Sequence, residues 1–560
     1  MIKEILLSLC ITLAPVWCAP AEKGNYAGPV VAMKLGSVRG QYVNAKGTAD
    51  VVEQYLGIPF AQPPIGPLRL AAPKPAQGWQ GIRDATQQPS MCLQNPDIVQ
   101  MVVKAMRLDV MGSGFSEDCL YLNVYTPSQR TEKLPVMVWI HGGGLVMGGA
   151  CTFDGSPLAA YEKVVVVVIQ YRLGLLGYFS LLPSGFSTGD KHAPGNWGFL
   201  DQIAALTWVK QNIDAFGGDP QSVTIAGESA GGISASYLTL SPMSKDLFQR
   251  AIFQSGVATV LGFSIEDHSI YAKTVANVTE CDFTTSEALV KCMREMTEEQ
   301  IIEAAKKKFV VHGAAVDGEF LKDKPENVLK SKDFQKVPIL IGTTNHEFGW
   351  MLAKASLNAF LPGEWVKGMD AKTAKETLDI VHKAGASGVN GIVLEKYLKD
   401  AETPEEIRDG FTEMIGDVLM VIPSITVASY HRDAGVPVYM YEFQHPPSIL
   451  KEHRPSFVKA DHGDDVGFVF GACFWDGHIK LVVALTEEEN EFCRTVMKYW
   501  ANFVRTGSPN PGPVPWPVYD QSNKYMNLGL QQSEGQDLKK EKLLFFTVEL
   551  PQKLAGLQKS

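Results

Sequence analysis

The five residues Gly227-Glu228-Ser229-Ala230-Gly231 are the most informative stretch of this chain of 560 residues. A short run of apolar and β-branched residues (223–226) precedes it, and an apolar helical pattern follows it. The pattern predicts a strand, a sharp turn and a helix with one serine at the apex. We therefore identify Ser229 as a candidate nucleophile, presented at the end of a sheet strand.

The small residues around Ser229 have a mechanical reason. The turn must be tight enough to hold Ser229 in a strained backbone conformation, and side chains at Gly227 and Gly231 would collide with the neighbouring strand and helix. The helix that begins behind Ser229 adds free N–H groups and a positive dipole end, which stabilise developing negative charge. Since an ordinary glycine-rich turn before a helix is the competing interpretation, the motif needs support from elsewhere in the chain.

A run of three glycines, Gly142 to Gly144, gives that support. It directly follows an apolar stretch (136–140) that we predict to be a buried strand. Backbone N–H groups without side chains can approach a substrate oxygen closely, so Gly143, Gly144 and Ala230 are candidates for an oxyanion hole. Alone, the run would favour a flexible surface loop, but beside the motif around Ser229 the oxyanion hole is the better interpretation.

Strands and helices alternate along the chain. Apolar runs at 136–140, 164–170, 250–255, 337–342 and 438–443 predict core strands, the last of them being the final clear one. Helical patterns cover 196–216, 357–427 and 487–505, and the segment after Gly36 predicts antiparallel edge strands. This order predicts an α/β protein with a large, mostly parallel twisted sheet, covered by helices on both faces.

An acid and a base follow the serine at the expected places. Glu347 comes just after the predicted strand 337–342, and His462 lies in a loop some twenty residues past the last predicted strand. The order Ser229, Glu347, His462 is that of α/β-hydrolases, in which the histidine takes the serine proton and the carboxylate orients the histidine. A solvated loop is the usual place of a glutamate, and His346 and His445 are rivals for the base.

The N-terminus predicts export. Residues 1–18 combine Lys3, an apolar body and small residues at the end, which is typical of a signal peptide, so we expect 19–560 to form a single domain. We find no later apolar run of membrane-spanning length and expect no transmembrane anchor. The net charge of −10 argues against nucleic acid or anionic membrane as a partner.

The cysteines predict two disulfides in an oxidising compartment. Cys92–Cys119 and Cys281–Cys292 are close, polar-flanked pairs, each worth roughly 3 kcal/mol by loop closure. We expect Cys151, Cys473 and Cys493 to remain buried free thiols, because no spacing resembles a zinc site. Asn277 begins the only glycosylation acceptor sequence, which we place in a surface loop.

Two segments make the chain resemble the type-B carboxylesterases, the family that also includes the cholinesterases. Both signature segments of the family, 117–124 and 216–231, are present without a departure, and the resemblance runs from about Gly36 to the C-terminal tail. It is strongest to vertebrate liver and intestinal carboxylesterases. It implies an α/β-hydrolase fold with helical insertions that form a gorge, and a triad of Ser229, Glu347 and His462. It also implies an oxyanion hole of Gly143, Gly144 and Ala230, and the same two disulfides.

Further expectations rest on this resemblance. Glu228 reaches into the gorge and Ser255 supports it, although packing is an equally good explanation of these two residues. The chain ends in Leu557-Gln558-Lys559-Ser560, without the usual retrieval signal, so secretion is favoured over retention in the endoplasmic reticulum lumen. Residues 181–187 look inserted relative to the family.

Together these features predict a serine esterase that cleaves hydrophobic carboxylic esters through an acyl-enzyme on Ser229, without metal or organic cofactor. Thioesters, amides and acylglycerols are further candidate substrates. Choline esters are poor candidates, because no tryptophan lies between Cys92 and Cys119 to hold the choline cation. A non-catalytic, neuroligin-like adhesion protein is the rival of another class, and the presence of Ser229 opposes it.

Overall fold

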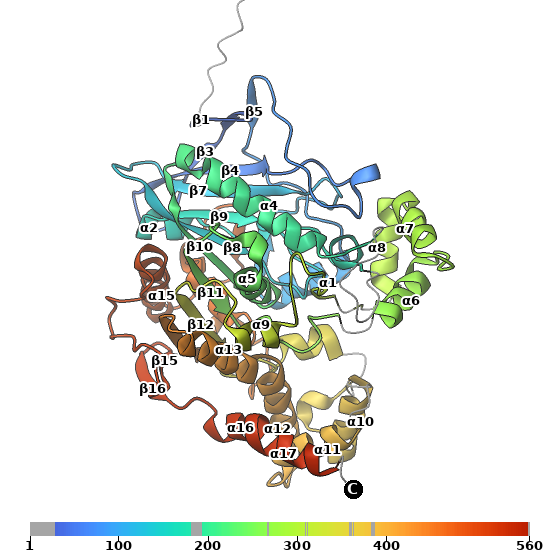
Figure 1. Cartoon of the computed structure of the whole chain (residues 1–560). Helices are drawn as coiled ribbons and strands as arrows, with labels where there is room; N and C mark the ends of the chain where they lie inside the picture. Colours follow the sequence, from blue (N-terminus) through green and yellow to red (C-terminus); the bar gives the residue numbers. More distant parts are fainter. Residues whose placement is uncertain are drawn as a thin grey trace, which may run out of the picture.

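The computed structural model describes residues 28–180, 193–265, 268–307, 310, 312–357, 361, 363–381 and 387–557 (Figure 1). Two predicted features, the signal peptide (1–18) and the inserted segment (181–187), lie outside the described residues.

An eleven-stranded sheet forms the centre of the molecule. Its strands, in spatial order, are β16 (Ser533–Gln536), β15 (Lys524–Leu528), β13 (Val438–Phe443), β12 (Ile339–Thr344), β11 (Arg250–Gln254), β10 (Gly218–Glu228), β8 (Leu134–Ile140), β9 (Val165–Ile169), β7 (Tyr121–Pro127), β4 (Val51–Pro59) and β3 (Gln41–Asn44). From β9 to β15 every neighbouring pair is parallel, whereas the strands at both edges pair antiparallel. The predicted mostly parallel sheet is confirmed, but β13 is not the last core strand, since β15 and β16 extend the sheet beyond it.

The central strands are buried on both faces, as expected of a parallel sheet. In β8, Val136, Val138 and Ile140 belong to one apolar cluster, while Met137 and Trp139 belong to the cluster on the opposite face. This arrangement explains why these strands are continuous apolar runs without polar alternation.

Helices cover both faces of the sheet (Figure 1). On one face lie α4 (Trp197–Asn212), α5 (Ala230–Leu240), α9 (Pro325–Ser331) and α13 (Ile422–Asp433). On the other lie α2 (Ser156–Glu162), α14 (Asp464–Val469) and α15 (Glu487–Thr506). The predicted helices 196–216 and 487–505 correspond to α4 and α15.

Two helical groups lie outside these layers (Figure 1). One comprises α3 (Gly174–Tyr178), α6 (His268–Thr279), α7 (Ser286–Glu295) and α8 (Glu298–Lys307). The other comprises α10 (Ala371–Val381), α11 (Ser387–Leu398), α12 (Pro404–Gly416), α16 (Lys540–Leu544) and α17 (Leu550–Leu557). Within the described residues, one continuous helical stretch, Pro404–Asp433, is long and apolar enough to cross a membrane, and 67% of its most apolar window is buried inside the protein.

Short strands and one helix complete the described fold. They are β1 (Val30–Met33), β2 (Gly36–Arg39) and β5 (Ile82–Asp84), which form a small sheet, β6 (Leu108–Val110) with β14 (Ile479–Leu481), and α1 (Pro96–Ala105).

Three disulfides link the described cysteines. Cys92–Cys119 and Cys281–Cys292 are the two predicted bonds, and Cys473–Cys493 is a third. The prediction that Cys473 and Cys493 stay free is therefore wrong, because the fold places Cys493 on α15 against the turn that carries Cys473. Cys151 is buried and free, as expected.

Asn277 is exposed, but it lies in the last turn of α6 and not in a loop as predicted. Thr279, the third residue of the glycosylation sequence, is the last residue of α6. Its hydroxyl donates a hydrogen bond to the carbonyl oxygen of Val275, one turn earlier in the helix, at 2.8 Å.

Candidate active site

Ser229 stands between β10 and α5, at the carboxyl edge of the parallel strands. Its backbone has φ 56° and ψ −124°, a strained conformation for a residue with a side chain, and only 9% of the residue is exposed. Its N–H donates to the carbonyl oxygen of Gln254 at the end of β11, at 2.8 Å. The neighbouring strand therefore holds the strained turn in place.

Close packing explains the glycines on either side of Ser229. A Cβ atom at Gly227 would lie 2.4 Å from the backbone of Gly231, and one at Gly231 would lie 1.9 Å from the carbonyl oxygen of Ile140. The predicted collisions with helix and strand are both confirmed.

Glu347 follows β12 by three residues and is 2% exposed. Its Oε1 accepts hydrogen bonds from the Ser255 hydroxyl (2.6 Å) and the Thr344 N–H (2.7 Å). Its Oε2 accepts one from Nδ1 of His462, at 2.6 Å. Ser255 thus supports Glu347, whereas the sequence led us to expect that it supports Glu228; the end of β11 points its hydroxyl at the acid instead.

The loop that carries His462 is joined to the loop that carries Glu347. His346 and Asp461 form a parallel β-bridge, and the N–H of Ala460 donates to the side chain of Asn345 at 3.0 Å. The buried carboxylate of Asp461 also accepts hydrogen bonds from two backbone N–H groups after Glu347, at 3.2 and 2.8 Å. These contacts fix the spacing between the acid and the imidazole.

Both rival histidines have other partners. Nε2 of His346 lies 3.2 Å from the hydroxyl of Thr412, and its Nδ1 accepts from the N–H of Lys459. Nε2 of His445 lies 2.9 Å from Glu489. Of these three histidines, only His462 is bonded to Glu347.

The second ring nitrogen of His462 faces the nucleophile's neighbour. Its Nε2 is 3.1 Å from Oε1 of Glu228, although neither atom makes a well-aligned hydrogen bond to a described residue. Gly142 lies beside both Glu228 and Ser229, because a Cβ atom there would be 2.7 Å from the Glu228 carboxylate and 3.1 Å from Cβ of Ser229. Serine, imidazole and glycine run therefore converge on one small region.

The two carboxylates determine the charge of His462. Burial opposes its protonation, but the carboxylates of Glu228 and Glu347 outweigh burial and raise the pKa of His462 to about 9. Burial raises the pKa of Glu228 to about 7, against the favourable charge of His462. The Glu228 carboxylate and the His462 imidazole thus compete for a proton in the middle of the site.

The glycine run has a backbone conformation that favours glycine. Gly143 (φ 105°) and Gly144 (φ 63°) lie in the left-handed region that favours glycine, and a Cβ atom at Gly143 would be 2.3 Å from the carbonyl oxygen of Met147. Ala230 is the first residue of α5, whose first N–H groups have no partner within the helix.

Sequence reasoning missed the residues that hold the glycine run in place. The buried ring of His141 stacks on Tyr171, with centroids 4.4 Å apart, and the Tyr171 hydroxyl donates to the carbonyl oxygen of His141 at 2.6 Å. His141 adjoins the glycines in the sequence, which was a usable signal. Nothing in the sequence marks Tyr171 as its partner.

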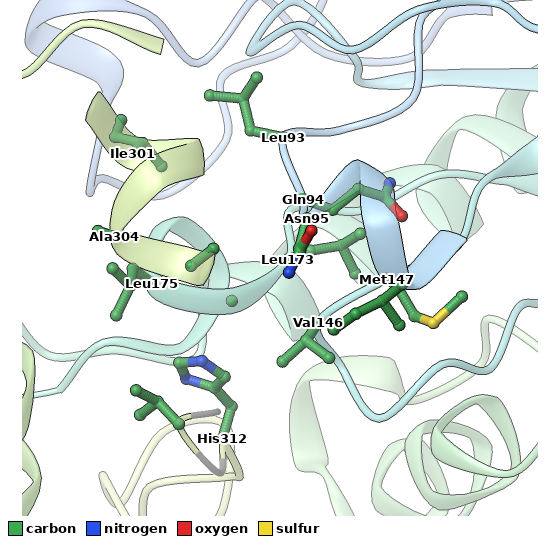
Figure 2. Close-up of a pocket in the computed structure, with 14 residues that line it drawn as sticks. Leu93, Gln94, Asn95, Val146, Met147, Leu173, Leu175, Ile301, Ala304 and His312 are labelled. Carbon is green, nitrogen blue, oxygen red and sulfur yellow. The ribbon is translucent and has the colours of Figure 1, made fainter. Parts of the chain in front are cut away.

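A mostly apolar pocket lies next to this loop (Figure 2). Its walls come from the segment around Leu93 to Asn95, from Val146 and Met147, from α3 and from α8. Val146 and Met147 follow directly on the glycine run, and their N–H groups both donate to the carbonyl oxygen of Gly143. The pocket therefore shares a wall with the candidate oxyanion hole.

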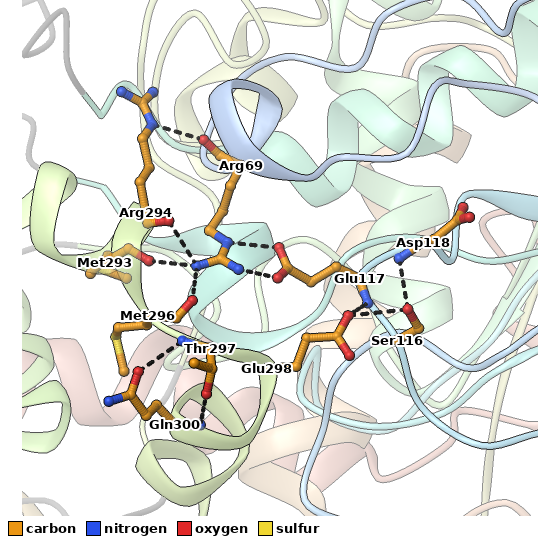
Figure 3. A network of polar contacts seen from close by, with 10 residues as sticks. All are labelled: Arg69, Ser116, Glu117, Asp118, Met293, Arg294, Met296, Thr297, Glu298 and Gln300. Atoms are coloured by element: carbon orange, nitrogen blue, oxygen red, sulfur yellow. Dashed lines mark hydrogen bonds and ion pairs between the residues drawn. The ribbon is translucent and has the colours of Figure 1, made fainter.

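A buried ion pair positions the wall formed by α8 (Figure 3). The guanidinium of Arg69 binds both carboxylate oxygens of Glu117 and three carbonyl oxygens at the end of α7. Glu298, the first residue of α8, accepts the N–H of Glu117 at 2.7 Å. The loop closed by the Cys92–Cys119 disulfide, which contains Glu117, is thereby attached to α8.

The mostly parallel sheet, the helices on both faces and the serine on the turn between β10 and α5 together define an α/β-hydrolase. Residues 27–546 match the model of the carboxylesterase family. The chain belongs to the carboxylesterase family and is a hydrolase of carboxylic esters.

Curated relatives match the chain along almost its whole length. It is 47% identical to pyrethroid hydrolase Ces2a of Mus musculus over 547 residues (95% of this chain, 94% of the relative). It is 46% identical to cocaine esterase of Homo sapiens (95% and 93%) and 46% identical to the medium-chain fatty acyl-CoA hydrolase precursor of Anas platyrhynchos (97% and 96%).

Proposed function

We propose that Ser229, Glu347 and His462 form the catalytic triad of this carboxylesterase. The observation that carries the proposal is the junction of the two loops, which holds the His462 imidazole 2.6 Å from Glu347, while its free nitrogen lies beside the residue that precedes Ser229. With Nδ1–H donated to Glu347, neutral His462 presents an unprotonated Nε2, as a general base must.

The reaction proceeds through an acyl-enzyme. Ser229 Oγ attacks the ester carbonyl while His462 takes its proton, and the oxyanion accepts hydrogen bonds from the N–H groups of Gly143, Gly144 and Ala230. His462 then returns the proton to the leaving alcohol, and water releases the acid by the same steps in reverse. Ester and water supply every atom that the products contain.

The substrates we propose are hydrophobic esters, with thioesters, amides and acylglycerols as further candidates. The pocket lining is mostly aliphatic, and relatives of the chain carry the names cocaine esterase and fatty acyl-CoA hydrolase. The three disulfides support synthesis through an oxidising compartment, such as the endoplasmic reticulum lumen, and we propose secretion from there.

Labelling with a fluorophosphonate tests the nucleophile directly. We expect one adduct, mapped by peptide analysis to Ser229, and Ser229→Ala should lower kcat for a p-nitrophenyl ester by roughly 10⁴-fold or more. Circular dichroism of the variant controls for folding. Labelling of a different residue, or full activity of Ser229→Ala, would contradict the proposal.

A further inference from the structure

The pocket of Figure 2 contains one polar ring among aliphatic side chains. His312 lines it together with residues such as Ile98, Leu175 and Val310. Only 3% of His312 is exposed, and Figure 2 shows its imidazole extending from its loop toward the other lining residues. The mechanism proposed above gives this histidine no role.

One nitrogen of His312 is occupied and the other is not. Nδ1 lies 2.6 Å from the hydroxyl of Tyr271 on α6, whereas Nε2 makes no hydrogen bond to another described residue. A Cβ atom at Gly174 of α3, itself a pocket residue, would lie 3.8 Å from Nε2. Nε2 of His312 therefore faces the pocket wall formed by α3, without a hydrogen-bond partner among the described residues.

The surroundings fix the charge and tautomer of this pair. Burial lowers the pKa of His312 to about 3, so the ring is neutral, and burial raises the pKa of Tyr271, so the phenol keeps its proton. If the phenol donates to Nδ1, its hydrogen is satisfied and the ring hydrogen sits on Nε2. The opposite tautomer would leave the buried phenol hydrogen without an acceptor among the described residues.

The pocket adjoins the loop that carries the candidate oxyanion hole. Val146 and Met147 line it and belong to the same loop as Gly143 and Gly144. Gln94, another lining residue, bonds to both the N–H and the carbonyl oxygen of Gly148 at 2.7 and 2.8 Å. The wall of the pocket and the candidate oxyanion hole are thus one connected structure.

We propose that His312 is a specificity-determining residue, whose Nε2–H donates a hydrogen bond to an uncharged oxygen in the substrate chain that enters this pocket. The ligand is an ester with an ether, hydroxyl or carbonyl oxygen remote from the scissile bond. The aliphatic walls of the pocket favour the hydrocarbon part of this ester. A substrate chain without an oxygen would bind less well, because it would leave the buried Nε2–H of His312 without an acceptor. The inference rests on the esterase function proposed above.

Matched ester pairs test the proposal. In each pair, one ester has an alkyl chain and the other has an ether oxygen in place of one methylene, moved along the chain from pair to pair. One arm of the series places the oxygen in the acyl group and the other in the alcohol. The measured quantity is the ratio of kcat/KM for the ether ester to kcat/KM for the alkyl ester.

His312→Leu should lower this ratio by roughly three- to tenfold in one arm, at one position of the oxygen. His312→Gln, which keeps an N–H donor, should restore part of it, and Tyr271→Phe should lower it less than His312→Leu does. Ile98→Leu changes the apolar wall but no donor, so its ratio should equal that of the wild type.

An unchanged ratio in both arms for His312→Leu would overturn the inference. If that variant does not fold, Tyr271→Phe decides, because an unchanged ratio there also overturns it. Failure of the wild type to hydrolyse either ester of any pair would contradict the esterase function itself and not the role of His312.

Discussion

Glu228 has an unusual position for a residue next to a nucleophile. Its carboxylate lies 3.1 Å from the imidazole nitrogen that must accept the serine proton, and burial raises its pKa to about 7. A charged Glu228 stabilises the imidazolium that forms during reaction. The same charge makes the free base harder to generate at low pH.

Glu228→Gln should therefore move the acid limb of the pH profile of kcat/KM to lower pH. Since the negative charge of Glu228 raises the pKa of His462, removing it lowers that pKa and leaves the imidazole neutral in more acid solution. Rates of p-nitrophenyl ester hydrolysis across the pH range measure the limb. A limb that stays in place, or moves to higher pH, would show that Glu228 does not control the base.

Ser255 donates to Glu347 from the end of β11, so its loss should weaken the orientation of the acid. We expect Ser255→Ala to lower kcat by about tenfold with little change in KM, because one hydrogen bond to a charged group is removed far from the bound chain. Ser424→Ala is the matched control, since its buried hydroxyl has no partner among the described residues. An equal effect of both substitutions would contradict a specific role of Ser255.

The candidate site could be predicted residue by residue where a motif marks the residue. Ser229, Gly143 and Glu347 each come shortly after a strand, and His462 lies in a loop some twenty residues past one. The partner of Ser255 could not be predicted, since the sequence does not say in which direction a side chain at a strand end points. His312 has no motif, and its significance comes only from packing against Tyr271.

At the level of elements, the turn between β10 and α5 depends on the absence of side chains. Gly231→Ala should prevent folding or lower Tm strongly, because the added Cβ would lie 1.9 Å from a carbonyl oxygen of β8 that cannot move. Gly391→Ala in α11 is the control, where nothing lies within 4 Å and alanine should stabilise the helix by up to about 1 kcal/mol.

Thermal unfolding followed by circular dichroism measures both variants. A wild-type Tm for Gly231→Ala would contradict the packing described for the turn.

Elements with a continuous or periodic apolar pattern could be predicted from the sequence, and elements with a weaker apolar pattern could not. The central strands are buried on both faces and read as continuous apolar runs. In contrast, β15 and β16 contain Lys524, Asn527 and Glu534, so their sequence gives no strand signal; they form because β13 offers an open edge. The acceptor sequence at Asn277 predicts a surface loop, but α6 continues through it.

At the level of the whole molecule, three disulfides leave one free thiol among the described cysteines. Titration with a thiol reagent in denaturant, without reductant, should find one reactive group in protein whose N-terminus lies beyond Cys18. Three groups would mean that Cys473 and Cys493 are not bonded. By loop closure, this bond of sequence separation 20 contributes about 3 kcal/mol to the free energy of unfolding.

The β-bridge between His346 and Asp461 has a consequence for how activity can be lost. The bridge joins the loops that follow β12 and β13, which carry Glu347 and His462, into one assembly. The Ser229 hydroxyl, in contrast, is carried by the turn after β10. Partial unfolding can then move the Ser229 hydroxyl away from the His462 imidazole without separating His462 from Glu347. Such a protein would not hydrolyse esters and would still keep the hydrogen bond between His462 and Glu347.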